Sequence, residues 1–225
     1  LFGTDDMGRD IFARTLYGGR ISLSVGLVSV GISLSIGVVL GAVAGFFGGM
    51  FDTVIMRIAD VFYSFPFMIL AITISSIFGP SIYNTMIILG ILSWPSSARL
   101  LRAEFLKLKN TDFALAATTI GANPSRVMFR HILPNAISPL LVSATLGVAS
   151  AILSEAGLSF LGLGVPPPAP SWGNMLNRAR PLHILASMPW MWLPPGIAIF
   201  VIVLSINFVG DGLRDAFDPR QVMNE

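Results

Sequence analysis

The sequence predicts an all-α protein that crosses a membrane several times, and two observations support this fold class. Of the 225 residues, 54% are hydrophobic and only 12% are charged, whereas a soluble domain usually carries about 25% charged residues. The chain also contains long runs without Asp, Glu, Lys or Arg, at 21–51, 61–98, 132–154 and 191–210. About 20 apolar residues span the hydrocarbon core as a helix, the form that satisfies its own backbone polar groups in lipid.

We expect five membrane-spanning helices. The run 61–98 is too long for one span, and the sequence FGPSIYN at 78–84 favours a turn within it. The predicted spans are therefore about 22–47, 61–78, 82–101, 134–154 and 191–210. They form a transmembrane domain, 21–210, that lies between an external interfacial segment, 1–20, and a cytoplasmic tail, 211–225. The domain includes a cytoplasmic loop at 103–133 and an external loop at 155–190.

One face of the first span carries small residues. Glycine recurs there at every fourth position, at Gly37, Gly41, Gly45 and Gly49. Such a stripe lets the backbones of two helices approach closely in a membrane. We therefore expect this face to pack against another helix, with lipid contact the less favoured alternative.

The distribution of basic residues predicts the orientation. Loops rich in Lys and Arg face the cytoplasm. The side that holds the 103–133 loop and the tail carries nine Lys and Arg residues, against five on the opposite side. We therefore expect this loop and the C-terminus to be cytoplasmic.

The loop 103–133 predicts two short helices. Asn110, Thr111 or Asp112 can cap the first helix, and Gly121 suits the left-handed residue that often follows a helix. Asn123 and Pro124 then predict the cap and first position of a second helix, and Pro134 marks entry into the next span. The alternatives are a rigid helical pair displayed to the cytosol and an amphipathic pair lying on the membrane surface.

Residues 115–134 resemble a coupling loop. The integral-membrane subunits of ABC importers carry the pattern Glu-Ala-Ala, three residues, Gly, nine residues, then Ile-x-Leu-Pro. The positions that match are Ala116, Ala117, Gly121, Leu133 and Pro134. Two positions depart from the pattern, because Leu115 stands where Glu is usual and His131 where Ile is usual. The segment FRHILPN at 129–135 is similar to the corresponding sequence in the peptide and nickel branch of the family.

Three more segments, 2–26, 159–176 and 207–220, resemble the C subunits of dipeptide and oligopeptide permeases. The four matches occur in the expected order and cover nearly the whole chain. The resemblance implies the transmembrane domain of a type I ABC importer with a cytoplasmic coupling helix pair. Such subunits have six spans, so it also implies that the first of six lies outside this sequence.

The resemblance implies a permease subunit that forms half of a pathway for di- or oligopeptides in the inner membrane of a prokaryote. An alternative cargo is a nickel chelate or another small nutrient. The implied partners are a second homologous permease subunit, two cytoplasmic ATPase subunits and an external substrate-binding protein. ATP and Mg would be used by the ATPases, with no cofactor bound by this chain, which has no G-x-x-x-x-G-K-[ST] loop.

The same comparison implies which residues meet the ATPase. Because an alanine face allows close approach, Ala114, Ala116 and Ala117 would admit a partner side chain or backbone. The residues expected to take part in ATPase coupling are Asp112, Leu115, Ala116, Ala117, Gly121, Arg126, Arg130, His131 and Pro134.

The sequence gives little support for metal binding, catalysis or ion coupling by this chain. Glu155, at the outer end of a span, could meet a peptide's amino group in the pathway, or it could be a helix-end carboxylate that lies in water or pairs with an arginine. His131 and His183 have no neighbouring ligand pair, so we expect no metal site, and no catalytic set is recognisable. A secondary transporter or channel is the alternative class, but coupling to ions requires ionisable residues within the spans, where this chain has almost none.

Overall fold

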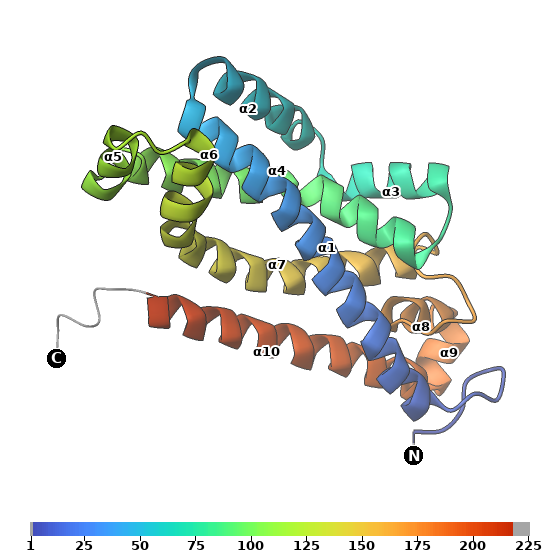
Figure 1. The fold of residues 1–225 in the computed structure, drawn as a ribbon. Helices are drawn as coiled ribbons and strands as arrows, with labels where there is room; N and C mark the ends of the chain where they lie inside the picture. The colour runs from blue at the N-terminus through green and yellow to red at the C-terminus, as the bar shows by residue number, and fades with distance from the viewer. Residues whose placement is uncertain (1, 218–225) are drawn as a thin grey trace.

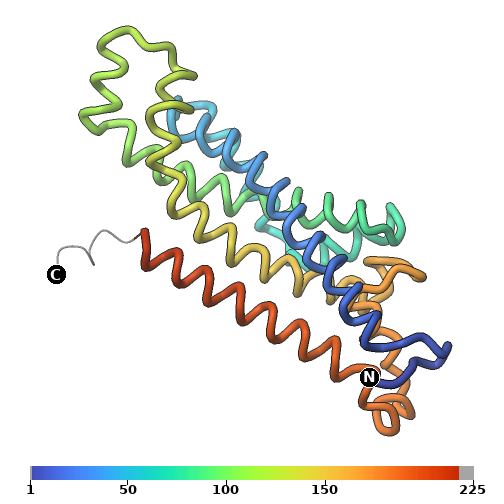
Figure 2. The backbone as a smooth tube through the Cα atoms, turned by 60° about the horizontal axis from the view of Figure 1, so that its bottom comes forward, coloured from blue at the N-terminus to red at the C-terminus, as the bar shows by residue number. Residues whose placement is uncertain are grey.

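The computed structural model describes residues 2–217, and its regular structure in that range is helical (Figure 1). The bounds are α1 Ile11–Phe47, α2 Gly49–Tyr63, α3 Phe67–Phe78, α4 Ile82–Leu108, α5 Asp112–Thr119, α6 Pro124–Arg126, the π-helical turn η1 Val127–Ile132, α7 Leu133–Phe160, α8 Trp172–Arg178, α9 Leu182–Ser187, the 3-10 turn η2 Pro189–Met191 and α10 Leu193–Phe217. The long helices α1, α4, α7 and α10 form the body of the molecule. The segment α5–α6 projects from one end, here the α5 end, and α8 and α9 cover the other, here the α8 end (Figure 2).

Helix α1 packs closely on α4 through its glycine face, as the sequence predicts. A Cβ placed at Gly41 would lie only 2.6 Å from the carbonyl oxygen of Ala98, and one at Gly45 would lie 2.5 Å from Cβ of Phe105. These separations leave no room for a side chain, so glycine sets the distance between the two helices. Gly49 does not belong to this face, because α1 ends at Phe47 and Gly49 begins α2.

Within residues 2–217, three helical segments are long and apolar enough to cross a membrane: α1, the continuous run Pro124–Phe160 and the run Pro189–Phe217. Helices α2 and α3 together pass the same test as a pair bent by 84°. Helix α4, which corresponds to the predicted span 82–101, is 27 residues long but is not apolar enough to be counted with them. The count of five spans therefore stays a prediction.

The prediction of one helix over 61–78 is wrong. Helix α2 ends at Tyr63, and α3 begins at Phe67, after Pro66, which has an extended backbone conformation (φ −60°, ψ 124°). Proline has no N–H to donate to the preceding turn, and it disfavours the helical conformation of the residue before it. The apolar composition predicted burial in lipid but not this break.

The predicted boundaries at the chain ends also differ. Helix α1 begins at Ile11, where the Asp10 side chain caps it by accepting from the Ala13 N–H at 3.2 Å, so half of the expected interfacial segment 1–20 is helical. At the other end, α10 continues through Phe217 rather than stopping at 210. The rest of the predicted tail lies outside the described residues.

Candidate functional site

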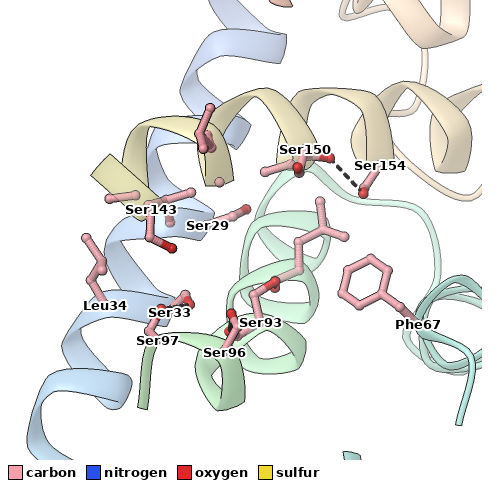
Figure 3. A pocket seen from close by; sticks show the side chains of 16 residues that line it. Ser29, Ser33, Leu34, Phe67, Ser93, Ser96, Ser97, Ser143, Ser150 and Ser154 are labelled. Atoms are coloured by element: carbon pink, nitrogen blue, oxygen red, sulfur yellow. Dashed lines mark hydrogen bonds between the residues drawn. The ribbon is translucent and has the colours of Figure 1, made fainter. Parts of the chain in front are cut away.

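A cavity of about 400 Å³ lies between α1, α3, α4 and α7 (Figure 3). Half of its sixteen lining residues are serines: Ser29, Ser33, Ser93, Ser96, Ser97, Ser143, Ser150 and Ser154. The others are apolar, among them Leu34 and Phe67, and none of the sixteen carries a charge. The cavity is thus an uncharged site in which serine hydroxyls lie among apolar side chains.

Helical geometry brings these serines together. Ser93, Ser96 and Ser97 are three and four positions apart on α4, and residues at that spacing share one helix face. Ser29 and Ser33 share a face of α1 for the same reason. Our sequence analysis missed this site, although hydroxyls recurring at helical spacing within apolar spans were a usable signal. Only the packing of the helices reveals that the three serine faces meet.

Most of the cavity hydroxyls already take part in hydrogen bonds. Four donate to main-chain carbonyl oxygens: Ser29 to Met86 at 3.1 Å, Ser93 to Leu89 at 2.7 Å, Ser96 to Ser93 at 2.9 Å and Ser154 to Ser150 at 2.8 Å. The hydroxyls of Ser33 and Ser97 lie 3.2 Å apart and share a bond. These bonds hold the oxygen atoms in place around the cavity.

Glu155 does not line this cavity, and its place on a transport pathway stays a prediction. Its side chain is fully buried, accepting hydrogen bonds from Ser22 Oγ at 2.7 Å and Ser159 Oγ at 2.6 Å. The alternatives of a water-exposed or arginine-paired carboxylate are wrong, since its partners are hydroxyls. The reason is that small residues of α1, such as Gly26, let that helix cover this part of α7.

The two serines on Glu155 extend its hydrogen bonds to the loop that follows α7. Ser159 Oγ accepts the main-chain N–H of Val165 at 3.0 Å, and Ser22 Oγ accepts that of Trp172 at 3.4 Å. Each hydroxyl has one proton and uses it to donate a hydrogen bond to the carboxylate, so each serine oxygen is left to accept from the main chain. We call these five residues the Glu155 network; it fixes the loop to α1 and α7.

Helix α8 and the N-terminal loop complete the α8 end. Ser171 and Asn174 form a reciprocal capping box at the start of α8. In the N-terminal loop, burial raises the pKa of Asp5, but hydrogen bonds from Arg9 and from the main-chain N–H of Met7 outweigh this and lower it below its usual value. The guanidinium of Arg178 lies 3.3 Å from a carboxylate oxygen of Asp6 and joins α8 to this loop.

At the α5 end, residues 112–126 form a compact projection, here the knob. Gly121 has φ +80°, and the N–H groups of Ala122 and Gly121 donate to the carbonyls of Ala117 and Thr118 at 3.1 and 3.0 Å. This is the Schellman pattern of helix termination. Asn123 then caps α6 by accepting from the Ser125 N–H at 3.2 Å, with Pro124 at the first position. The predicted caps around Gly121 are confirmed.

The faces of the knob divide the expected coupling residues. Ala114 and Ala117 are buried against Val127, Met128 and Ile132 of the same chain. The expectation that both alanines face a partner is therefore corrected, because their small size serves internal packing. The residues of the predicted set that are exposed are Asp112, Leu115, Ala116, Gly121, Arg126, Arg130 and Pro134, while His131 is half-buried.

The knob continues into the bundle without a break. Residues Pro124–Phe160 form one helical run of 37 residues, so Pro134 lies inside a helix and does not mark a new start. The π-helical turn Val127–Ile132 precedes this proline. A helical proline removes a hydrogen bond and crowds the carbonyl four residues earlier, and a wider turn at that point accommodates both effects. The run joins the knob to the cavity wall and to Glu155.

Metal chemistry has no visible site in the described part of the chain. Across residues 2–217, no three His, Cys, Asp or Glu side chains gather so that they could hold a metal ion.

Comparison with known proteins identifies the family to which this chain belongs. Residues 37–222 match the family described as "Binding-protein-dependent transport system inner membrane component". The chain is 52% identical over 223 residues to a putative peptide permease protein of Brucella suis, a match covering 99% of this chain and 74% of that protein. It is 47% identical over 219 residues to the dipeptide transport system permease protein DppC of Alkalihalophilus pseudofirmus, covering 97% and 71%. The inward-facing MetNI methionine ABC transporter has the same fold, with a TM-score of 0.74 and 18% identity over 92% of this chain and 98% of that one.

The family match and the helical fold together identify a membrane transport subunit. The chain belongs to the family of binding-protein-dependent transport system inner membrane components, the permease subunits of ABC importers. It is a multi-pass inner membrane protein with the type I importer fold.

Proposed function

We propose that this permease subunit forms half of a pathway for di- or oligopeptides, that the pathway passes the serine-lined cavity, and that the knob couples the cavity to ATPase subunits. The peptide cargo is supported by the names of relatives that are 52% and 47% identical over nearly the whole chain. The cavity supports passage of a polar molecule, since its hydroxyls replace hydrogen bonds to water.

The observation that carries the proposal is the unbroken helical run Pro124–Phe160. Its first residues belong to the exposed knob, and Ser143, Ser150 and Ser154 farther along line the cavity. A push on the knob therefore moves one cavity wall as a rigid body relative to α1 and α4. Such rigid movement of packed elements is a common means of switching between two states, here inward and outward access.

The partners follow from this assignment. We infer a second homologous permease subunit that supplies the other half of the pathway, two ATPase subunits that use ATP and Mg in the cytoplasm, and an external substrate-binding protein. ATP hydrolysis would then reside entirely in the partner subunits. The excess of basic residues on the knob side, nine against five, supports a cytoplasmic knob and C-terminus.

A charged substitution on the knob tests the coupling. Ile120 is 84% exposed on the knob, and Leu182 is 81% exposed at the opposite end, so Ile120→Asp and Leu182→Asp remove equally exposed apolar side chains. Each variant is expressed with the second permease subunit, the ATPases and the binding protein. We expect Ile120→Asp to lower both ATPase recovery in pull-down and peptide uptake about tenfold, while Leu182→Asp leaves ATPase recovery unchanged.

Either of two results would contradict the proposal. If both variants retain full ATPase recovery and uptake, the knob lies on the membrane surface and does not couple. If the wild-type complex takes up no peptide although the ATPases are bound, the cargo belongs to another class.

A further inference from the structure

The hydroxyls around the cavity are not chemically equivalent to free serine side chains. A serine hydroxyl has one proton to donate and two lone pairs that can accept. Ser29, Ser93, Ser96 and Ser154 already donate their proton to main-chain carbonyls, at 2.7 to 3.1 Å. Toward the cavity these four therefore offer acceptors.

The remaining hydroxyls supply fewer hydrogen-bond donors than the cavity wall has acceptors. Ser33 and Ser97 use one proton between them, because one hydroxyl donates to the other at 3.2 Å. This leaves one proton of that pair and those of Ser143 and Ser150 for a ligand, against lone pairs on all eight oxygens. Acceptors thus outnumber available donors on the wall.

The lining contains no arginine, lysine or histidine to reverse this preference. A carboxylate entering the cavity could accept hydrogen bonds only from those three remaining protons, because Ser29, Ser93, Ser96 and Ser154 could donate to it only after giving up a bond to a main-chain carbonyl. An ammonium or amide N–H group needs no such exchange, because the lone pairs already face the cavity. An unmade hydrogen bond to a buried group is costly, while a made one adds a modest net gain.

The size of the cavity limits what it can hold. Small-molecule sites commonly measure about 300 to 1,000 Å³, and this one, at about 400 Å³, lies at the lower end. It can therefore hold a small polar molecule or a short segment of a peptide cargo.

We propose that the serine-lined cavity is a binding site for hydrogen-bond donor groups of the cargo, ammonium and amide N–H, and that it disfavours carboxylates. The proposal rests on the proposed function and adds a chemical preference to it. The preference arises from hydroxyl oxygens whose protons are already donated to the helices.

The test removes two acceptors from one wall. The variant Ser93→Ala/Ser96→Ala deletes two α4 hydroxyls that donate to their own helix, at 2.7 and 2.9 Å. The matched control is Ser205→Ala, whose hydroxyl makes the same kind of bond, to Val201 at 2.8 Å, on the exposed surface of α10. Alanine is the better helix former, so we expect both variants to fold, which thermal unfolding of the purified complex checks.

The readout is uptake by the complete transporter in proteoliposomes with its binding protein. The probes are trialanine and its counterparts carrying lysine or glutamate at the central position. Dividing each variant's lysine-to-glutamate uptake ratio by the wild-type ratio cancels the preference of the binding protein. One hydrogen bond of about 1 kcal/mol corresponds to about a fivefold change, so we expect the double variant to lower this ratio about fivefold or more and Ser205→Ala to leave it unchanged.

The outcomes separate the two proposals. If the double variant transports all three peptides at the wild-type ratio, the donor preference is refuted while peptide import stands. If the wild-type complex takes up none of the peptides, the proposed function fails and the preference falls with it.

Discussion

The knob and the loop after α7 each contain a glycine with positive φ just past the end of a helix, Gly121 after α5 and Gly162 after α7, yet the two regions are held in place by different forces. The knob rests on small apolar contacts, where Ala114 and Ala117 meet the π-helical turn. The loop is held by the Glu155 network, which contains a fully buried carboxylate. Leu115 and Ile120 remain exposed on the knob at 50% and 84%.

The difference indicates how each region works. Hydrogen bonds between buried groups demand one geometry, because a displaced partner leaves a polar group unpaired. Apolar contacts tolerate small displacements and leave the outer face of the knob free for a partner. We therefore expect the α8 end to respond to substitutions by losing structure and the α5 end to respond by losing function.

The largest effect is expected from Gly173→Ala at the α8 end. A Cβ at this position would lie 2.5 Å from the carbonyl oxygen of Ala156 and 2.7 Å from its Cα, and backbone atoms cannot move aside. Overpacking of this kind destabilises by about 3 kcal/mol, which thermal unfolding of the purified complex would measure. Gly212→Ala, on α10 with open space around the new Cβ, is the control and should not destabilise. Equal stability of the two variants would mean that α8 is not packed on α7 as described.

The next effect is expected from Glu155→Gln. The amide keeps one acceptor but replaces the other with a donor, so one of the serine hydroxyls loses its acceptor and its bond to the loop weakens. The change should destabilise by about 1 kcal/mol and speed proteolytic cleavage within 161–171. Glu104→Gln, which alters a carboxylate that lies 3.9 Å from the ammonium of Lys107 and far from the loop in sequence, should leave cleavage unchanged. Slow cleavage in both variants would show that the carboxylate does not hold the loop.

A smaller effect, equal at both ends, is expected from Gly121→Ala and Gly162→Ala. The two glycines have φ of +80° and +84°, and the methyl group of an alanine at either position would have open space within 4 Å, so backbone strain alone acts. A non-glycine residue in this region costs about 1 kcal/mol or slightly more. Stability should fall alike, but only Gly121→Ala should reduce ATPase recovery in pull-down. Loss of ATPase with Gly162→Ala instead would place the docking surface at the wrong end.

The smallest change in stability is expected from Leu115→Glu, which restores the residue usual in the coupling-loop pattern. Leu115 is half exposed and faces away from the packed alanines, and such surface substitutions usually shift stability by no more than about 0.5 kcal/mol. ATPase recovery should be retained, because the resemblance places a glutamate here. Recovery that collapses would show that this chain's partner presents an apolar surface at this position.

Local chemistry made much of the architecture predictable. Low charge and long apolar runs predicted a helical membrane protein, and Gly121, Asn123 and Pro124 predicted the turn of the knob. These features depend on residues within a few positions of one another, so the sequence contains all the information they require. The glycine face of α1 was predictable for the same reason, apart from Gly49, since periodicity does not reveal where a helix ends.

The sequence by itself determined the class of protein, the apolar spans and the caps of the knob, since composition, periodicity and capping act over a few turns of chain. Only the tertiary structure decided which residues meet across helices. It buried Glu155 between Ser22 and Ser159, turned Ala117 inward and gathered the serines of α1, α4 and α7 around one cavity. These outcomes depend on which helix faces approach each other. That is set by contacts between residues far apart in the chain, such as Ser22 and Glu155, which are 133 positions apart.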